Sequence, residues 1–267
     1  MGPVSTPLVS AEEVAEELAS SFARKRGVVG VVYLGALARG YFDEHSDIDI
    51  VVYKRRGVRL GWPREKEYTY KGFTVDLEVR DYEKELRRPW TPEERWVFLN
   101  ARIRYDPEGL VRKLFELKAR LTERERIRLL EDELRRAEWS LGDARAWLHR
   151  GSLLSAHYTV TVALRHLLRS IVLLNGLPPP PDKWLIHAAM SSEKQPPQLE
   201  KLMRDALECQ RLDAQELKRR VSVVELLLDW ARSQSARRSW RERKASRGSI
   251  TGAGGGEESR RTVEEEY

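Results

Sequence analysis

Residues 34–50 read LGALARGYFDEHSDIDI, a glycine turn followed by two aspartates that stand one residue apart. Side chains alternate between the two faces of a strand, so Asp47 and Asp49 are expected on one face. Ile48 and Ile50 then point the other way, into the core. Two carboxylates on one face of a buried strand repel each other unless a cation lies between them. The stretch therefore predicts a divalent-metal site, and its hard oxygen ligands suit magnesium.

This stretch resembles the signature of the DNA polymerase beta-like nucleotidyltransferase superfamily. In that signature an apolar-Gly-Ser turn precedes a strand that reads Asp-apolar-Asp-apolar. Here Gly35 supplies the glycine and residues 47–50 supply the strand, while Ala36 stands where the family usually has serine. The Ala-Arg-Gly at residues 38–40 also resembles the smaller bacterial and archaeal members, of the kanamycin-nucleotidyltransferase type. The resemblance implies a mixed β-sheet with flanking helices.

A third carboxylate is expected on a neighbouring strand. Residues 66–80 are typical of a hairpin with Lys71-Gly72 as its turn. In the second strand apolar residues alternate with Asp76 and Glu78, which share the opposite face. Asp76 stands where the resembled family places its third acid, and Glu78 is the competing candidate. The plainer interpretation is that both residues form the solvated face of an edge strand.

The resemblance also implies a reaction, which is the transfer of a nucleoside monophosphate from an NTP to a hydroxyl group with release of pyrophosphate. ATP is the expected donor. Asp47, Asp49 and Asp76 would be the catalytic residues and would hold two Mg²⁺ ions, or Mn²⁺ in their place. Such ions stabilise the attacking and leaving oxygens of an in-line displacement.

The nucleotide itself would be bound, by the same resemblance, at Gly35, Ala36, Arg39 and Ser46. The family's serine donates a hydrogen bond to a phosphate, and its absence at Ala36 costs roughly 1.5–3 kcal/mol of binding. Arg39 could supply compensating positive charge. The alternative is a surface arginine that forms a salt bridge with a loop carboxylate at residues 43–44.

The sequence changes character near residue 105, where strand-like runs give way to helical periodicity. We therefore predict an α+β chain with a nucleotidyltransferase domain at 1–106 and an all-α up-and-down bundle at 107–234. Residues 235–267 are polar and glycine-rich, which predicts a disordered tail.

The elements expected in the first domain are a helix opened by a Ser10/Glu13 capping box, strands at 28–34 and 47–53, the hairpin, a helix opened by a Thr91/Glu94 capping box and a strand at 101–105. In the bundle, apolar residues spaced by three and four predict long helices at 122–148, 153–174 and 213–231, with shorter ones at 183–190 and 198–209.

Composition limits where the protein works. The single Cys209 excludes a disulfide framework, and no apolar run is long enough to cross a membrane, so a cytoplasmic protein is expected. The 48 Lys and Arg against 42 Asp and Glu give a net charge of +6, but much of the excess lies at residues 237–247. The charge is therefore weak evidence for nucleic-acid binding. The 34% of charged residues favours a thermophilic or an archaeal source.

The helical half resembles bundles of the HEPN kind, some of which cleave RNA with an Arg followed by a His. Arg150 and His157 match the loosest form of that pattern, but Gly151-Ser152 would interrupt the helix between them. Packed or polar-face histidines are the plainer interpretation.

Two further alternatives concern partners. The second function is that of a catalytically impaired nucleotide- or RNA-binding protein, related to toxin–antitoxin pairs. The acceptor could be a small molecule, a protein or RNA, and the chain could form a homodimer. An acceptor pocket between the domains would be lined by Trp147, Tyr158, Arg165 or His166.

Overall fold

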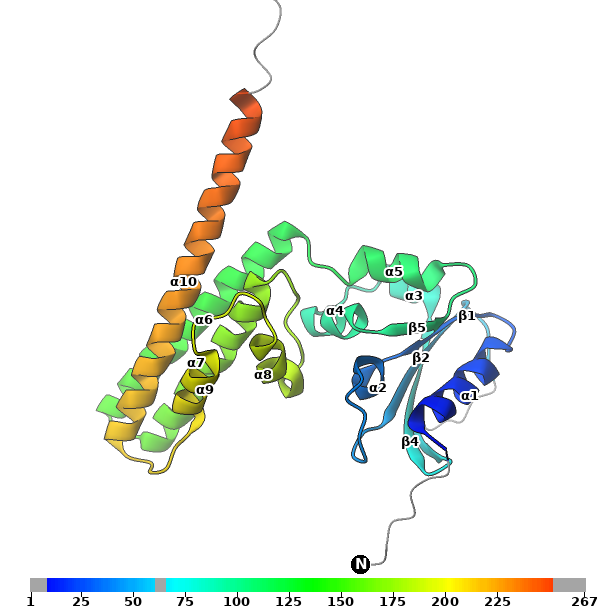
Figure 1. Ribbon diagram of the computed structural model, residues 1–267, viewed down its shortest axis with the longest axis horizontal. Helices are drawn as coiled ribbons and strands as arrows, with labels where there is room; N and C mark the ends of the chain where they lie inside the picture. The colour runs from blue at the N-terminus through cyan, green and yellow to red at the C-terminus, as the bar shows by residue number, and fades with distance from the viewer. Residues whose placement is uncertain (1–8, 61–65, 252–267) are drawn as a thin grey trace, which may run out of the picture. The chain divides into compact units, whose positions relative to one another are not determined.

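The protein has an α+β fold in which a five-stranded sheet with its helices precedes a series of long helices (Figure 1). The computed structural model describes residues 9–60 and 66–251. The elements of the first part are α1 (Ala11–Ala23), β1 (Val28–Tyr33), α2 (Gly35–Arg39), β2 (Ile48–Lys54), β3 (Glu67–Tyr70), β4 (Phe73–Asp81), α3 (Tyr82–Arg87), α4 (Pro92–Leu99), β5 (Arg102–Tyr105) and α5 (Leu110–Lys118). The later elements are α6 (Glu123–His149), α7 (Leu153–Leu174), α8 (Asp182–Met190), α9 (Leu199–Leu207) and α10 (Ala214–Thr251).

The sheet has the strand order β3-β4-β2-β1-β5. The β2–β4 pair is parallel and the other neighbouring pairs are antiparallel, so the sheet is mixed, as predicted. The β3–β4 hairpin turns at Lys71 and Gly72, and both residues have positive φ. The α+β fold class inferred from the sequence is therefore confirmed.

Both faces of the sheet are covered. Helix α1 packs on one face, and α3, α4 and α5 contribute buried side chains to the core on the other. Strand β2 serves both cores, because Ile48 and Ile50 lie in the α1 core while Val51 and Tyr53 lie in the second. Asp49 occupies the first position of β2 on the second face. A carboxylate therefore stands where the pattern further along the strand is apolar.

The helix starts follow the predicted capping boxes. The Ser10 and Thr91 hydroxyls accept hydrogen bonds from the backbone N–H groups of Glu13 and Glu94, and both glutamates bond back to the cap residues. Each box satisfies N–H groups that the first helical turn leaves without an intrahelical partner.

The chain divides into two compact units. One consists of residues 1–136 with 168–195, and the other of residues 137–167 with 196–267. This division does not coincide with the boundary expected at residue 106, because the first unit also includes parts of α6 and α7 and all of α8.

Ion pairs explain why the first unit extends beyond the sheet. The buried guanidinium of Arg169, on α7, contacts Glu93 of α4 at 2.7 Å and Glu133 of α6 at 2.6 Å. Arg95 of α4 contacts Glu125 of α6 at 2.9 Å. Buried charges require such partners, so these contacts join the helices to the sheet domain.

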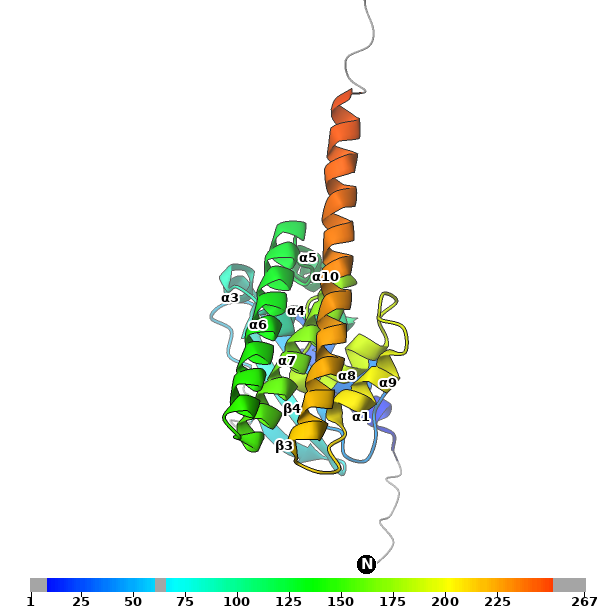
Figure 2. The same cartoon turned by 90° about the vertical axis from the view of Figure 1, so that its left-hand side faces the viewer.

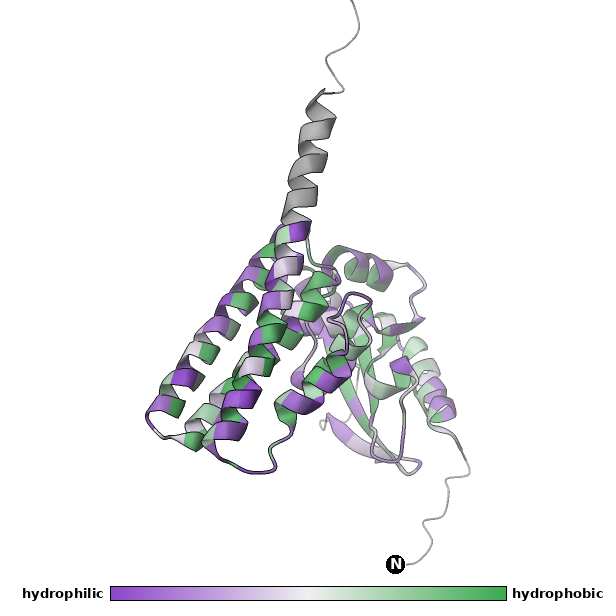
Figure 3. Ribbon diagram, turned by 60° about the vertical axis from the view of Figure 1, so that its left-hand side comes forward, coloured by the Kyte–Doolittle hydropathy of each residue, from purple (hydrophilic) through white to green (hydrophobic). Residues whose placement is uncertain are grey.

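In the second unit α6 and α10 lie side by side (Figure 2), linked by the Arg145–Glu225 and Arg232–Glu138 ion pairs. The helices carry hydrophobic and hydrophilic stripes (Figure 3), and the predicted apolar positions are buried. These include Leu141 and Ala144 of α6, Val160 and Leu164 of α7, and Leu217, Val221 and Val224 of α10.

Helix α10 continues to Thr251, so residues 235–251 are helical rather than disordered as expected. This segment contains no proline and has five arginines, a residue type that favours helix. The remainder of the predicted tail, residues 252–267, lies outside the described residues. Across residues 9–60 and 66–251, no helix combines the length and the apolar character that a membrane span requires.

Candidate functional site

The parallel pairing of β2 and β4 places two of the three predicted aspartates next to each other. Asp49 of β2 is the register partner of Asp76 of β4, and partners on adjacent strands point to the same face. Asp49 is half-buried, whereas Asp76 is exposed. Asp47 is also exposed and lies just before the first residue of β2.

The electrostatics of Asp49 reflect this neighbourhood. Burial raises the pKa of Asp49 to about 6, and the charge of Asp76 acts in the same direction. Asp47 also raises this pKa, while Lys183 and Arg39 lower it. Asp47 and Asp76 therefore both act on Asp49, and a cation at this point would relieve the repulsion.

Gly35 touches the Asp49 carboxylate, which joins the two ends of the sequence motif. A Cβ added to Gly35 would lie 1.8 Å from Oδ2 of Asp49, and the residue has φ +60°. Any side chain would both collide with the carboxylate and be strained in that conformation. The glycine is thus required by the aspartate that lies against it.

The competing candidate Glu78 is engaged elsewhere. Its carboxylate contacts the guanidinium of Arg80 at 2.7 Å, and its register partner on β2 is Val51 rather than an aspartate. Asp76 is therefore the acid of β4 that lies beside Asp49.

Glu67 is an acid that the sequence analysis did not single out. It is the β3 register partner of Asp76, so Asp49, Asp76 and Glu67 form a row across three neighbouring strands. Counting back from the Lys71-Gly72 turn would have revealed this pairing, because a two-residue turn fixes the register of a hairpin.

The donor chemistry of the aspartates fits a hard divalent cation, since carboxylate oxygens are what magnesium prefers. Among the residues that the structure describes, however, no group of three or more His, Cys, Asp or Glu side chains converges closely enough to hold a metal ion. The close arrangement is the Asp49–Asp76 pair, with Asp47 within electrostatic reach.

Arg39 does not form the surface salt bridge that was the alternative to phosphate binding. Its guanidinium lies 3.7 Å from the ring centre of Trp96 and 4.6 Å from that of Trp184. The Nε and Nη1 atoms are buried and have no hydrogen-bond partner within the described chain. Burial lowers the pKa of Arg39 to about 10, with Asp49 opposing that change. Arg39 therefore stays charged at neutral pH, beside the aspartates.

Ser46, predicted to bind the nucleotide, already uses its hydroxyl within the loop before β2. The Oγ atom donates to Oδ1 of Asp43 at 2.8 Å and accepts from the Asp43 backbone N–H at 3.2 Å. These bonds shape the loop that leads into Asp47. A role in nucleotide binding stays a prediction.

Sequence reasoning missed the residues of helix α8 that act on the aspartates or pack beside them. Lys183 acts on the pKa of Asp49, after burial and Asp76 in size, and Trp184 stacks on Arg39. His187, one turn along α8, meets the ring of Tyr41 edge to face at 5.0 Å. No local pattern in the sequence signals a contact between residues so far apart in the chain.

The residues proposed for the bundle have other partners. His157 contacts Arg220, a buried residue of α10, while the guanidinium of Arg150 lies over the ring of Trp147. Arg150 and His157 therefore do not pair with each other. Trp147, Tyr158, Arg165 and His166 all belong to the second compact unit, and the acceptor pocket expected there stays a prediction.

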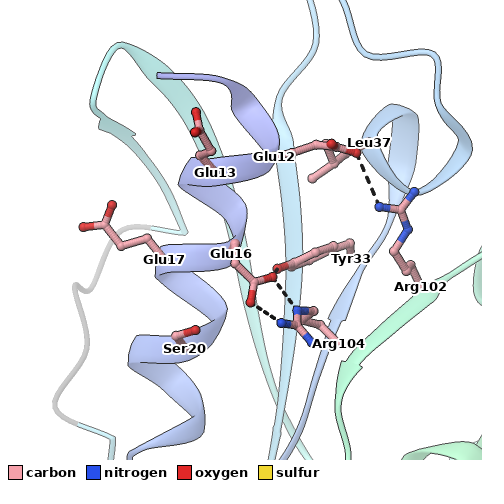
Figure 4. A pocket seen from close by; sticks show the side chains of 9 residues that line it. All are labelled: Glu12, Glu13, Glu16, Glu17, Ser20, Tyr33, Leu37, Arg102 and Arg104. Atoms are coloured by element: carbon pink, nitrogen blue, oxygen red, sulfur yellow. Dashed lines mark hydrogen bonds and ion pairs between the residues drawn. The ribbon is translucent and has the colours of Figure 1, made fainter. Parts of the chain in front are cut away.

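A cavity of about 710 Å³ lies beside α1, on the sheet face opposite Asp49 (Figure 4). Inside it Glu16 bonds to Arg104 and to the hydroxyl of Tyr33, and Glu12 pairs with Arg102. It contains none of the predicted site residues, and Glu12 and Glu16 are paired there with two arginines of β5.

Comparisons with known proteins agree with this geometry. The model of the nucleotidyltransferase domain family matches residues 15–138, which include all three aspartates and Gly35. No curated protein matches the chain. Among solved structures, a nucleotidyltransferase-like protein from Exiguobacterium sibiricum 255-15 is 19% identical, with a TM-score of 0.50, over 85% of this chain and 78% of that one. Residues 15–138, with their mixed sheet and paired aspartates, thus match the nucleotidyltransferase domain family.

Proposed function

We propose that the protein transfers a nucleoside monophosphate from an NTP to a hydroxyl acceptor and releases pyrophosphate. The observation that carries the proposal is the Asp49–Asp76 pair, held against Gly35 inside a nucleotidyltransferase domain. A half-buried carboxylate with a raised pKa beside a second carboxylate is costly for stability, which is typical of functional sites.

In the reaction, the acceptor oxygen attacks the α-phosphorus of the NTP. The bond from that phosphorus to the bridging oxygen breaks, and pyrophosphate leaves with the bridging oxygen. The acceptor hydroxyl loses its proton in this step. Asp76 is exposed on β4 beside Asp49, where it could accept that proton.

Asp47, Asp49 and Asp76 would hold Mg²⁺, with two ions as the family pattern suggests and Mn²⁺ as the alternative. Bound ions of this kind supply positive charge to the phosphates and to the attacking oxygen. Asp49 contributes a fixed position, because Gly35 and the strand β2 hold its carboxylate.

Arg39 supplies a second source of positive charge. The two tryptophan rings fix its guanidinium, so little side-chain freedom is lost when it meets an anion. Its unpartnered Nε and Nη1 groups are donors that a phosphate oxygen could satisfy. This charge would offset the missing hydroxyl at Ala36.

The proposal is tested by incubating the full chain with α-³²P-labelled NTPs, Mg²⁺ and acceptors of three classes, namely aminoglycosides, proteins and RNA. Label should pass to one class, and Asp49→Asn should abolish the transfer. Asp229→Asn, at an exposed position of α10, is the matched control and should keep it.

A second function, nucleotide binding without transfer, is favoured by Ala36 and by the lack of a three-ligand cluster among the described residues. It predicts NTP binding without label transfer to any acceptor in the same experiment.

A further inference from the structure

Three aromatic side chains meet beside Arg39, and we call Tyr41, Trp184 and His187 the aromatic group. Tyr41 follows α2, while Trp184 and His187 stand three residues apart on α8 and so share one face of that helix. The ring centres of Tyr41 lie 5.0 Å from His187 and 6.1 Å from Trp184. All three residues belong to the first compact unit.

The aromatic group is open to solvent. Tyr41 is 53% exposed and His187 is also exposed, whereas Trp184 is half-buried. Single exposed aromatic residues are common, but three rings that converge at one place are not explained by chance exposure. Their arrangement offers ring edges and faces to a flat ligand.

Arg39, which packs against Trp184 of the aromatic group, has buried N–H donors that need hydrogen-bond acceptors. Trp184 covers one part of its guanidinium and Trp96 another, and Nε and Nη1 are buried without a hydrogen-bond partner. Buried N–H donors are normally satisfied, so these two call for acceptor atoms that the described chain does not provide. The ligand should therefore combine a flat ring with hydrogen-bond acceptors or negative charge.

The aromatic group also adjoins the aspartates. Lys183 directly precedes Trp184 in α8. Its positive charge and that of Arg39 both lower the pKa of Asp49. A ligand bound to the aromatic group would thus have its other end near Asp49 and Asp76. A nucleotide has this division, because its base is flat and its phosphates are charged.

We propose that Tyr41, Trp184 and His187 bind the nucleobase of the donor NTP, with Arg39 directed to acceptor atoms of the same nucleotide. This inference rests on the proposed function and names the part of the substrate that helix α8 recognises. A strand of RNA would need several rings in line along a basic groove, whereas these rings converge at a single position. The group accordingly fits one base.

The test compares Mg²⁺-ATP with Mg²⁺-tripolyphosphate, which has the phosphates but no base, by titration calorimetry on the full chain. Stacking on aromatic side chains should make ATP bind about tenfold more tightly than tripolyphosphate. Tyr41→Ala and His187→Ala should each remove most of that difference and leave the affinity for tripolyphosphate unchanged. Tyr41→Phe should keep the difference, because the ring remains.

Tyr158→Ala is the matched control, since Tyr158 is an exposed tyrosine of the second unit. It should leave both affinities as they are. Equal affinities for ATP and tripolyphosphate in the unaltered protein would overturn the base site and leave the proposed function standing. A loss of both affinities in Tyr41→Ala would overturn it too, because the ring would then support the phosphate site. If neither compound binds, the proposed function fails, and this inference fails with it.

Discussion

Glu16 on the α1 face of the sheet and Asp49 on the other face are in opposite electrostatic states. On the α1 face, Glu16 is paired with Arg104, and that hydrogen bond lowers the pKa of Glu16 below its ordinary value. On the other face, burial raises the pKa of Asp49 to about 6, and its strand neighbour is another carboxylate. Glu16 is therefore paired with a cation, whereas Asp49 lies beside a second carboxylate. Such a pair of unneutralised like charges is typical of a functional site.

The strongest test of this contrast removes the unsatisfied acids. The double variant Asp47→Asn with Asp49→Asn should lose all nucleotide transfer, together with the rise in melting temperature that Mg²⁺-NTP gives the unaltered protein. A ligand at one hundred times its Kd adds about 2.7 kcal/mol of stability, and the double variant should show none of it. Thermal unfolding with and without Mg²⁺-ATP measures this.

Without ligand the double variant should be as stable as the unaltered protein or more so, because it lacks the carboxylate repulsion. If Mg²⁺-ATP still stabilises it fully, the nucleotide binds elsewhere, and the contrast between the two faces loses its functional meaning.

The pH dependence of stability should carry the signature of Asp49. Its pKa is about 6 in the folded state against an ordinary 3.8, so folding favours the protonated form. Well below pH 3.8 the carboxyl is protonated in both states and costs no stability. Between about pH 4 and pH 6 the unfolded state loses this proton while the folded state keeps it, so the folded protein loses up to about 3 kcal/mol relative to Asp49→Asn, and the loss stays constant above pH 6.

The measurement is urea unfolding of the unaltered protein and Asp49→Asn in EDTA, from pH 4 to pH 7.5. The difference in unfolding free energy between the two proteins should grow with pH and then level off. A difference that does not change with pH would show that Asp49 titrates as an ordinary exposed aspartate.

Replacing the glycine that supports Asp49 should have a smaller effect. In Gly35→Ala the new Cβ would meet Oδ2 of Asp49 at 1.8 Å, and alanine at φ +60° is strained. The left-handed conformation alone costs roughly 1–2 kcal/mol. We expect that loss of stability in urea unfolding, together with weaker Mg²⁺-ATP binding, because the carboxylate must move.

Gly40→Ala is a matched control, because Gly40 also has positive φ but nothing lies within 4 Å of an added Cβ. It should lose similar stability and keep its affinity for Mg²⁺-ATP. Equal losses of affinity in the two variants would show that the Gly35–Asp49 contact has no special role.

If the glycine turn at residues 35–36 binds phosphate, a substitution there should raise the affinity for Mg²⁺-ATP. Ala36→Ser restores the hydroxyl that the family pattern has at this position, and a hydrogen bond to a charged group is worth roughly 1.5–3 kcal/mol. We expect Mg²⁺-ATP to bind at least about tenfold more tightly, as measured by calorimetry. An unchanged affinity would place the phosphates away from Ala36.

The parts of the site that could be predicted are those governed by local periodicity. Alternation along β2 and β4 distinguished the core residues from Asp49 and Asp76, and the turn at Lys71-Gly72 located the hairpin. The packing of Trp184 on Arg39 could not be predicted, because nothing in either segment encodes the other.

The burial of Arg39 against two tryptophan rings could not be predicted for the same reason. An arginine near Asp43 and Glu44 in sequence reads as a surface ion pair, but the fold buries it between two rings. The helical continuation of α10 to Thr251 was also missed, because low hydrophobicity was taken as disorder although the segment has no proline and many arginines.

The smallest effect on stability and activity is expected from the paired charges of Glu16 and Arg104 on the α1 face. Glu16 and Arg104 have side chains that are 43% and 49% exposed, and such pairs contribute about 0.2–1 kcal/mol. Glu16→Gln should therefore cost less than about 1 kcal/mol in urea unfolding and leave label transfer and Mg²⁺-ATP affinity unchanged. Added salt should reduce even that small cost, since it screens exposed charges. A large fall in transfer in Glu16→Gln, with stability preserved, would mean that the cavity beside α1 takes part in the reaction. Pairing of Glu16 with Arg104 would then not mark a site without function.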